Sequence, residues 1–325
     1  MIVDSHAHLT PQALINAIRR ERGRFPSVRV IEEGDSIALA FGNAKPTRPV
    51  SKGLIDVSSR IAWMNDQRID RQVVGGWVDS FGYELPPAEG EAWSRLANEA
   101  MLSATRAEPR LVPLATVPLQ DGQRAGAVLK AAMRDGFAGA MIGTLPRGIG
   151  STLDSADLDP FWAAADDAGA VVLVHPSYDA GDLRVGDYGL ANAIGRVADA
   201  MVAVGRLVCS GHMIKYSNAR ICVPMGGAGL PFLVGRLKRN YKLTRGVADP
   251  VEALSRLYVD TIVHDPRVLK FVIEMLGADR LVMGSDMPFP IGDQEPMRII
   301  QEAAVSDASA ASINGGLAAR LFRLA

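Results

Sequence analysis

The feature that most constrains this chain is the alternation of short apolar runs with longer amphipathic segments, which is clearest from about residue 100 onward. This alternation is typical of βαβ units built around a parallel sheet. Eight apolar runs are nearly continuous, as expected of strands buried on both faces. They predict strands at residues 1–4, 72–78, 111–116, 139–142, 170–174, 220–223, 257–261 and 281–283.

Eight such strands predict an α/β fold, a closed (β/α)8 barrel of the TIM type that need not be regular. The intervening segments GQRAGAVLKAAMRDG (122–136) and DPFWAAADDAG (159–169) place apolar residues at helical spacing, which predicts helices that pack on the barrel. Two polar loops, 143–158 and 179–189, would follow the fourth and fifth strands. They would lie at the carboxyl face of the barrel, where barrel active sites are built.

At 325 residues and 34.7 kDa the chain is longer than a typical single domain, but (β/α)8 barrels routinely reach this length. We therefore expect one barrel domain over residues 1–325. Residues from about 10 to 52 depart from the alternation, because they mix strand-like patterns with glycine, proline and basic residues. This region predicts an insertion after the first strand, in the form of a small antiparallel flap.

The charge balance excludes some classes of partner. Lys and Arg total 35 and Asp and Glu total 36, so the basic excess of a protein that binds nucleic acid or anionic membrane is missing. The longest uncharged stretch, between Arg220 and Arg236, is too short and too rich in glycine and proline to span a membrane. Cys209 and Cys222 lack CxxC spacing, and the N-terminus shows no export signal. We expect a cytoplasmic protein with a small-molecule partner.

Three histidines and an aspartate lie at the carboxyl ends of predicted strands. His6 and His8 form an H-x-H in which alternate strand residues point to the same side. His175 ends the run AVVLV, and Asp286 follows the last strand in LVMGSDMPFP. The strand order brings three imidazoles and one carboxylate to one point, which suits a catalytic divalent ion with an open position.

Taken singly, any strand-end histidine is more often a hydrogen-bonded structural residue than a ligand. The ordered set of four on the correct strands favours a metal site. His264 follows the seventh strand in VDTIVHDPRVL. It is a candidate catalytic or substrate-contacting residue, and a neighbour of the cap of the next helix is an equally good reading.

Seven ordered segments give the chain a specific resemblance to a known family. They are DSHAHL at the start, FGY at 81–83, VPLQD at 117–121, LVHP around His175, GGAGLPFLVGRL at 226–237, VDTIVHDPRVL at 259–269 and GADRLVMGSDMPFP at 277–290. Over nearly its whole length the chain resembles the amidohydrolase-2 group of the amidohydrolase superfamily. Within that group it is most similar to 2-amino-3-carboxymuconate-6-semialdehyde decarboxylases and related metal-dependent aromatic-acid decarboxylases.

The resemblance implies that the four strand-end residues hold one zinc or manganese ion, with zinc the first expectation. It also implies that Arg48 grips a substrate carboxylate and that Arg236 reaches into the site of a partner in a homodimer. From the sequence alone, either arginine is more typical of a solvated surface charge. We further expect a substrate pocket lined by Trp77, Tyr83 and Tyr178.

One position departs from the pattern of the family. The decarboxylases carry a histidine before the Gly-Gly that follows the sixth strand, and it helps to move protons; here this residue is Met225, in ICVPMGGAG. A thioether is no proton carrier. For decarboxylation the proton would have to come from water on the metal, from Asp286 or from His264.

Two reactions and one inactive alternative remain open. The first is nonoxidative decarboxylation of an unsaturated or aromatic acid. The second is hydrolysis or hydration of an ester, lactone, amide or vinylogous carbonyl acid, with Asp286 as general base, which needs no histidine after the sixth strand. The third is a barrel that retains the metal for stability or ligand binding but has no turnover.

Overall fold

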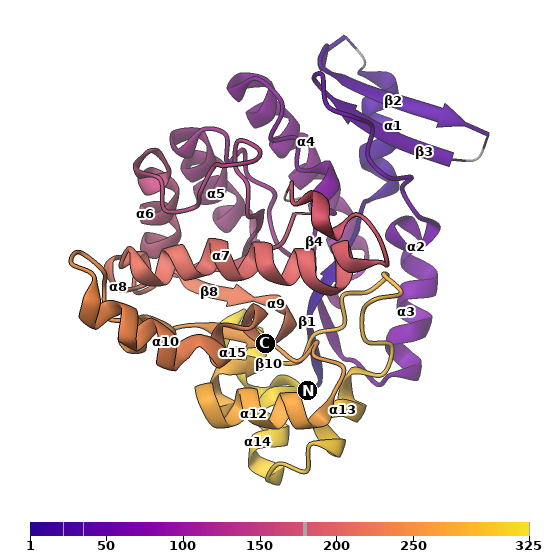
Figure 1. Cartoon of the computed structure of the whole chain (residues 1–325). Coiled ribbons are helices and arrows are strands. Elements are labelled where there is room, and N and C mark those ends of the chain that lie inside the picture. Colours follow the sequence, from indigo (N-terminus) through magenta and orange to yellow (C-terminus); the bar gives the residue numbers. More distant parts are fainter. Residues whose placement is uncertain (22, 35, 178–180, 325) are drawn as a thin grey trace.

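A computed structural model (Figure 1) describes residues 1–21, 23–34, 36–177 and 181–324. It contains a strand at each of the eight predicted positions. The first strand extends further than predicted, because it continues through the H-x-H instead of ending at Asp4. The eight strands are β1 (Val3–His8), β4 (Arg71–Gly75), β5 (Leu111–Pro113), β6 (Gly139–Gly143), β7 (Val171–His175), β8 (Arg220–Val223), β9 (Tyr258–Asp260) and β10 (Leu281–Val282).

The strands form two parallel sheets that meet along two seams. One sheet has the order β1-β4-β5 and the other the order β10-β9-β8-β7-β6. At the first seam, the Ala115 N–H donates to Gly139 O at 2.9 Å. At the second, the N–H groups of Ser5 and His8 donate to Met283 O and Met287 O, both at 2.8 Å. These bonds close the ring and confirm the predicted (β/α)8 barrel.

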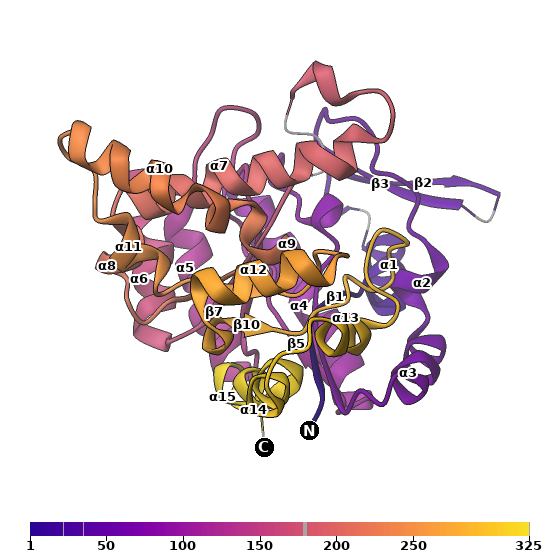
Figure 2. The ribbon, with the colours of Figure 1, turned by 60° about the horizontal axis from the view of Figure 1, so that its bottom comes forward.

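The helices lie outside the strands, as Figures 1 and 2 show. Both helices predicted in detail are confirmed as α5 and α6. The Asp121 carboxylate accepts from Arg124 N at the start of α5, and Gly136 ends that helix with a left-handed φ of 102°. The barrel helices include α3 (Val57–Asp66), α4 (Pro87–Ala107), α5 (Gly122–Asp135), α6 (Asp159–Ala168), α7 (Arg196–Cys209), α10 (Leu230–Leu243), α12 (Pro266–Leu276) and α13 (Pro296–Glu302).

Shorter helices fill the connections and cover one end of the barrel. Near the termini, α15 contributes Leu317 and Leu321 to the same apolar cluster as Val3 of the first strand. The short helices are α2 (Lys52–Ile55), α8 (His212–Lys215), α9 (Pro224–Ala228), α11 (Pro250–Leu254), α14 (Asp307–Ala311) and α15 (Leu317–Leu321). No helix in the described part of the chain has both the length and the apolar character needed to cross a bilayer.

The insertion predicted after the first strand is confirmed. It contains α1 (Gln12–Arg20) and an antiparallel ribbon of β2 (Val28–Glu33) and β3 (Ser36–Phe41), which projects from the barrel in Figure 1. The ribbon has its own apolar cluster with α1 and α4, in which Phe25 and Phe41 pack edge-on against Trp93.

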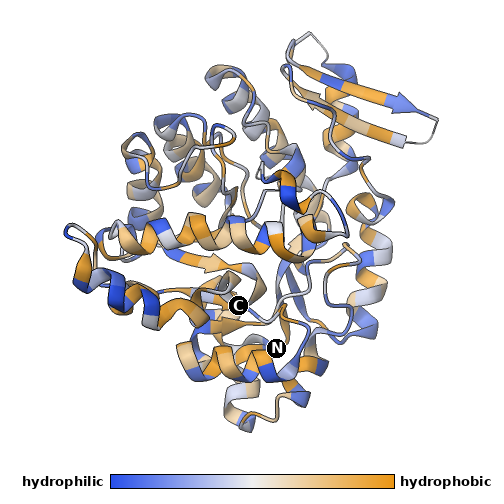
Figure 3. Cartoon of the chain, viewed as in Figure 1, coloured by the Kyte–Doolittle hydropathy of each residue, from blue (hydrophilic) through white to orange (hydrophobic). Residues whose placement is uncertain are grey.

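Two apolar layers hold the barrel together. Inside the ring, Met141, Leu173 and Cys222 belong to one buried cluster. Outside it, the helices bury one face each, and Figure 3 shows the corresponding hydrophobic and hydrophilic stripes. Because alternate strand residues point inward, Leu173 and His175 share the interior face of β7. The sequence of this strand therefore carries an imidazole to the mouth of the barrel.

Substitution of Trp162, in α6, measures how much the outer apolar layer contributes to the free energy of unfolding. The Trp162 side chain is fully buried, and its indole N–H donates to Leu153 O at 2.8 Å. We expect Trp162→Ala to lower the free energy of unfolding by about 3–5 kcal/mol, because it leaves a cavity and an unpaired carbonyl. Val202→Ala, at an exposed position of α7, should change it by less than about 0.5 kcal/mol. Urea unfolding of both variants measures this, and equal effects would contradict the assignment.

Candidate metal centre

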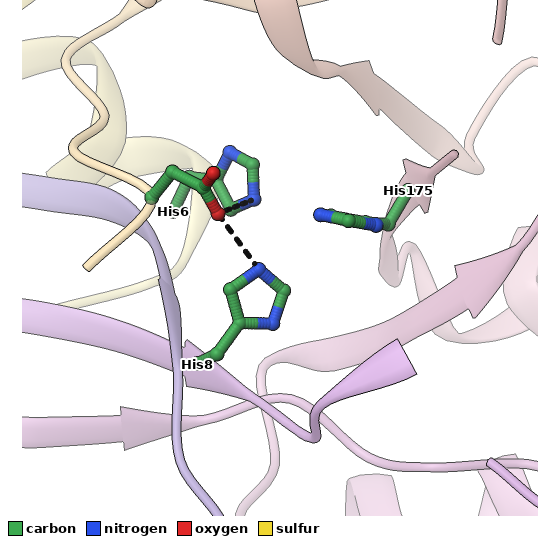
Figure 4. A group of neighbouring side chains, drawn as sticks. His6, His8 and His175 are labelled. Carbon is green, nitrogen blue, oxygen red and sulfur yellow. Dashed lines mark ion pairs between the residues drawn. The ribbon is translucent and has the colours of Figure 1, made fainter. Parts of the chain in front are cut away.

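Four buried side chains converge at the carboxyl end of the barrel. His6 and His8 come from β1, His175 ends β7, and Asp286 follows β10. One ligand atom from each lies within 4.8 Å of the others. Figure 4 shows the imidazoles of His6, His8 and His175 pointing toward a common centre. The predicted convergence of these residues is therefore present in the fold.

The outer nitrogen of each ring is held by an acceptor. The Nδ1–H groups donate to Asp260 Oδ2 at 2.9 Å for His6, to Gly76 O at 3.1 Å for His8, and to Pro176 O at 2.9 Å for His175. With these bonds, each ring carries its proton on Nδ1 when it is neutral. Each Nε2 therefore presents a lone pair to the centre, which is the arrangement of histidines that ligate a metal.

The inner atoms of the cluster are polar, buried and unsatisfied. His6 Nε2, His8 Nε2 and Asp286 Oδ1 have no hydrogen-bond partner among the described residues, although His8 Nε2 lies 3.0 Å from Asp286 Oδ1. Leaving such atoms unpaired in a protein interior costs about 1–3 kcal/mol each. A divalent cation would satisfy all of them at once, and nitrogen with carboxylate oxygen is a donor set that zinc and other transition metals accept.

The surroundings of the imidazoles shift their pKa values in different directions. Burial lowers the pKa of His8, and burial together with the charges of neighbouring His8, His6 and Arg196 lowers the pKa of His175 well below its usual value. Both rings are thus neutral at pH 7 and able to ligate. Burial opposes the charged form of His6 as well, but the hydrogen bond to Asp260 and the charge of Asp286 raise its pKa.

Asp260 supports the cluster although the sequence analysis did not select it. It ends β9, is 1% exposed, and its Oδ1 also accepts from the backbone N–H groups of Gly226 at 3.3 Å and Ile262 at 3.1 Å. Its signal in the sequence was a carboxylate at the end of the seventh predicted strand, which is the position that delivers functional side chains in this fold.

A cavity of about 300 Å³ opens beside the cluster. His6, His175 and Asp286 lie on its surface, and so do Met225 and His264. The remaining described lining is mostly apolar: Pro176, Ala193, Val197, Pro224, Ile262, Val263, Val268 and Ile291, together with the polar Asn192 and Arg196. A metal at the cluster would face a pocket suited to a small ligand with an apolar body.

Three residues of this site have strained backbones. Met225, His264 and Asp286 have φ values of 57°, 57° and 58°, in the left-handed region that residues with a Cβ seldom adopt. Such conformations cost about 1–3 kcal/mol each and concentrate at functional sites. All three reach the cavity from segments that follow barrel strands, so the strain lies where the side chains must be directed inward.

Arg48, Trp77 and Tyr83 are near the site but are not among the described residues that line this cavity. The Arg48 guanidinium donates to Asp79 at 2.9 and 3.3 Å and lies over the ring of Trp77, 5.4 Å from its centroid. The Tyr83 hydroxyl accepts from Gly143 N at 3.1 Å, at the end of β6. Burial raises the pKa of Tyr83, so its hydroxyl stays protonated at neutral pH.

The other two predicted substrate contacts are Arg236 and Tyr178. Arg236 is exposed on α10 and is absent from the described lining of the cavity. Tyr178 falls outside the described residues. The sequence analysis also missed Arg196, which begins α7 and is 7% exposed. The sequence offered little sign of it, because arginines inside amphipathic helices are usually solvated.

Comparison with known proteins supports, over the whole chain, the family resemblance seen in the sequence. A model of the amidohydrolase family matches residues 3–324. A 2-amino-3-carboxymuconate-6-semialdehyde decarboxylase of Dictyostelium discoideum is 25% identical over 307 residues, which cover 92% of this chain and 85% of that protein.

Solved structures share the fold. A 5-carboxyvanillate decarboxylase from Sphingomonas paucimobilis superposes with a TM-score of 0.82 at 22% identity, covering 100% of this chain and 99% of that one. A second, from Novosphingobium aromaticivorans, was solved with manganese and 4-hydroxy-3-methoxy-5-nitrobenzoic acid. It has a TM-score of 0.81 at 19% identity and covers 100% and 96% of the two chains.

Removal of one imidazole tests the cluster. His175→Ala deletes an inward Nε2 and removes the hydrogen bond from the ring to the neighbouring Pro176 O. We expect bound metal after loading with zinc or manganese and dialysis to fall by at least about tenfold, because a ligand is lost. His264→Ala removes a cavity histidine outside the cluster and should retain the metal. Elemental analysis measures both, and unchanged metal content in His175→Ala would exclude that residue as a ligand.

Proposed function

This chain belongs to the amidohydrolase family, and from that premise we propose that it is a metal-dependent, nonoxidative decarboxylase of an unsaturated or aromatic carboxylic acid. One observation carries the proposal: three imidazoles and a carboxylate converge at the end of a largely apolar cavity. The decarboxylase names of the similar proteins, which match along most of the chain, support this choice among the reactions of the family.

We propose that His6, His8, His175 and Asp286 hold one divalent ion. The donor set of three nitrogens and one carboxylate oxygen suits zinc, and manganese, which is present in a similar structure, is the alternative. When bound, the ion supplies a Lewis acid that polarises a carboxylate or carbonyl group of the ligand.

The chain itself supplies binding, exclusion of water and a proton. The apolar walls formed by residues such as Ile262, Val263 and Ile291 favour a planar hydrocarbon body. In the reaction, the bond between the ring or vinyl carbon and the carboxylate breaks, carbon dioxide leaves, and a proton takes its place on that carbon. His264 lines the cavity and is our candidate donor of this proton, because Met225 has none to give.

Met225 is the reason to consider a second function. It lies on the cavity where the decarboxylases of the family carry a histidine, and this change favours a hydrolase or hydratase that acts on an ester, lactone, amide or vinylogous carbonyl acid. In that reaction the free oxygen of Asp286 would act as general base toward water. A protein that binds metal and ligand without turnover is the third possibility.

We further propose a cytoplasmic homodimer in which α10 contacts the partner and Arg236 extends toward the partner's site. Phe232 and Leu243 on this helix are 78% and 70% exposed, which is unusual for large apolar side chains and fits a covered surface. Cys209 and Cys222 are free thiols, in keeping with a reducing compartment.

Product analysis separates the candidate reactions. Metal-loaded protein is incubated with hydroxybenzoic, carboxyvanillic and muconate-type acids, and with esters and lactones of similar size. Decarboxylation predicts carbon dioxide in equal amount to a product that has lost the carboxyl group, whereas a product heavier by one water supports the alternative. If protein with one metal per chain converts none of these compounds, the decarboxylase proposal fails, and binding of metal and ligand without turnover becomes the better-supported function.

Replacement of Met225 tests the proton balance. If the chemistry is decarboxylation, Met225→His restores a proton carrier and should raise the rate by roughly 10²- to 10⁴-fold at unchanged metal content. Met225→Leu, which keeps the site apolar, should leave the rate within a few-fold of the parent protein. A Met225→His variant that holds its metal but gains no decarboxylase activity would argue for a dedicated hydrolase or hydratase. Steady-state rates with the best acid from the panel provide the measurement.

A further inference from the structure

One wall of the cavity is a single helical face. Asn192 and Ala193 belong to a π-helical segment, Ala191–Gly195 (η4), and Arg196 and Val197 begin α7 directly after it. All four line the cavity, and their spacing of one, three and one residues places them on the same side of the helix. Wide π-turns are uncommon and occur often at functional sites. The helix is therefore shaped to present this face to the ligand.

Arg196 gives this wall a fixed positive charge. Its guanidinium cannot lose a proton at neutral pH, yet the side chain is 7% exposed. It lines the same cavity as His175 and Asp286, so a cation is buried beside the metal cluster.

The wall is fixed to the barrel strands. One turn beyond Arg196, the carboxylate of Asp199 accepts from Ser177 N at 2.9 Å and from the hydroxyl of Thr144. Thr144 follows β6, and Ser177 lies two residues after His175. The start of α7 is thus tied to the same strand ends that deliver the cluster, so the position of Arg196 relative to His175 is set by the fold.

The two arginines near the site differ in position. Arg48 donates to Asp79 and is not among the described residues that line the cavity. Arg196 is the only arginine among the described residues that line the cavity. The remaining described lining is imidazole, carboxylate, amide or apolar, so this residue is the fixed cation that a bound anion would meet.

We propose that Arg196 binds a carboxylate of the substrate, beside the metal cluster and on the wall formed by residues 191–197. This inference rests on the proposed function and names the residue that recognises the carboxylate of that substrate. Such an acid would place its hydrocarbon part against Val197, Ile262 and Ile291, and its anionic group between the guanidinium and the cluster. An uncharged analogue of the same shape would lose the guanidinium contact and bind more weakly.

The test compares acids with their own amides. Metal-loaded protein is titrated calorimetrically with salicylate and benzoate and with salicylamide and benzamide. We expect Arg196→Met, which keeps the apolar stem, to weaken both carboxylates by about 10- to 100-fold and both amides by less than about twofold. Arg196→Lys keeps the charge without the fork and should retain part of the preference for the acids. The control is Arg134→Met, at an exposed position near the end of α5, which should change neither.

Several results would overturn the proposal. They are equal weakening of acids and amides in Arg196→Met, unchanged binding of the acids, and a parent protein that binds neither acid. Thermal melting and metal content verify each variant, and if Arg196→Met is unfolded, the ratio of acid to amide affinity in Arg196→Lys decides. Failure of the proposed function is a separate result: acids that depend on Arg196 for binding but release no carbon dioxide would leave the anchor intact and remove the decarboxylase assignment.

Discussion

The geometry of the metal centre depends on three hydrogen bonds, in which the Nδ1–H groups of His6, His8 and His175 donate to fixed acceptors. Gly76 O and Pro176 O hold His8 and His175 through the backbone, and the Asp260 carboxylate holds His6. With these bonds in place, the Nε2 atoms of the three rings face the same centre, where those of His6 and His8 have no hydrogen-bond partner among the described residues. A cation is the species that satisfies this arrangement at least cost, because it replaces several unmade bonds with one set of ligand contacts. The chemistry of the site therefore depends on the groups that accept hydrogen bonds from the three rings.

A buried polar network also joins the strands at the seam of the barrel. Asp4 accepts from Ser285 N at 3.0 Å and from Gln72 Nε2 at 2.7 Å, which joins three neighbouring strand segments below the cluster. Burial raises the pKa of Asp4 despite these bonds. Arg60 donates to Gln72 Oε1 at 2.7 Å and to the carbonyl of His8, and burial lowers its pKa to about 10. Because the network spans the closing seam, the positions of His6 and His8 depend on the barrel being closed.

The sequence predicted the eight strand positions, the insertion and the convergence of four residues, because each rests on a local pattern. Apolar runs mark buried strands, and the residue that ends such a run must lie at the mouth of the barrel. The sequence did not predict the roles of Asp260 and Arg196 or the pairing of Arg48 with Asp79. These features depend on which distant segments become neighbours in the fold, and a single sequence carries no direct record of that. The extent of the first strand was misjudged for a related reason: its polar residues Asp4, Ser5 and His6 are satisfied by tertiary contacts that a local pattern does not contain.

Met225, which has no proton to transfer, and the buried cation of Arg196 line the same cavity. Thioether and aliphatic walls lower the local polarity, which strengthens the attraction between a guanidinium and an anionic group. They also favour loss of the carboxylate as carbon dioxide, because a neutral product is easier to accommodate than the anion in an apolar pocket. Met225 itself argues the other way, because it supplies no proton. The departure of carbon dioxide therefore requires a proton from another group on the cavity, and His264 is our candidate for it.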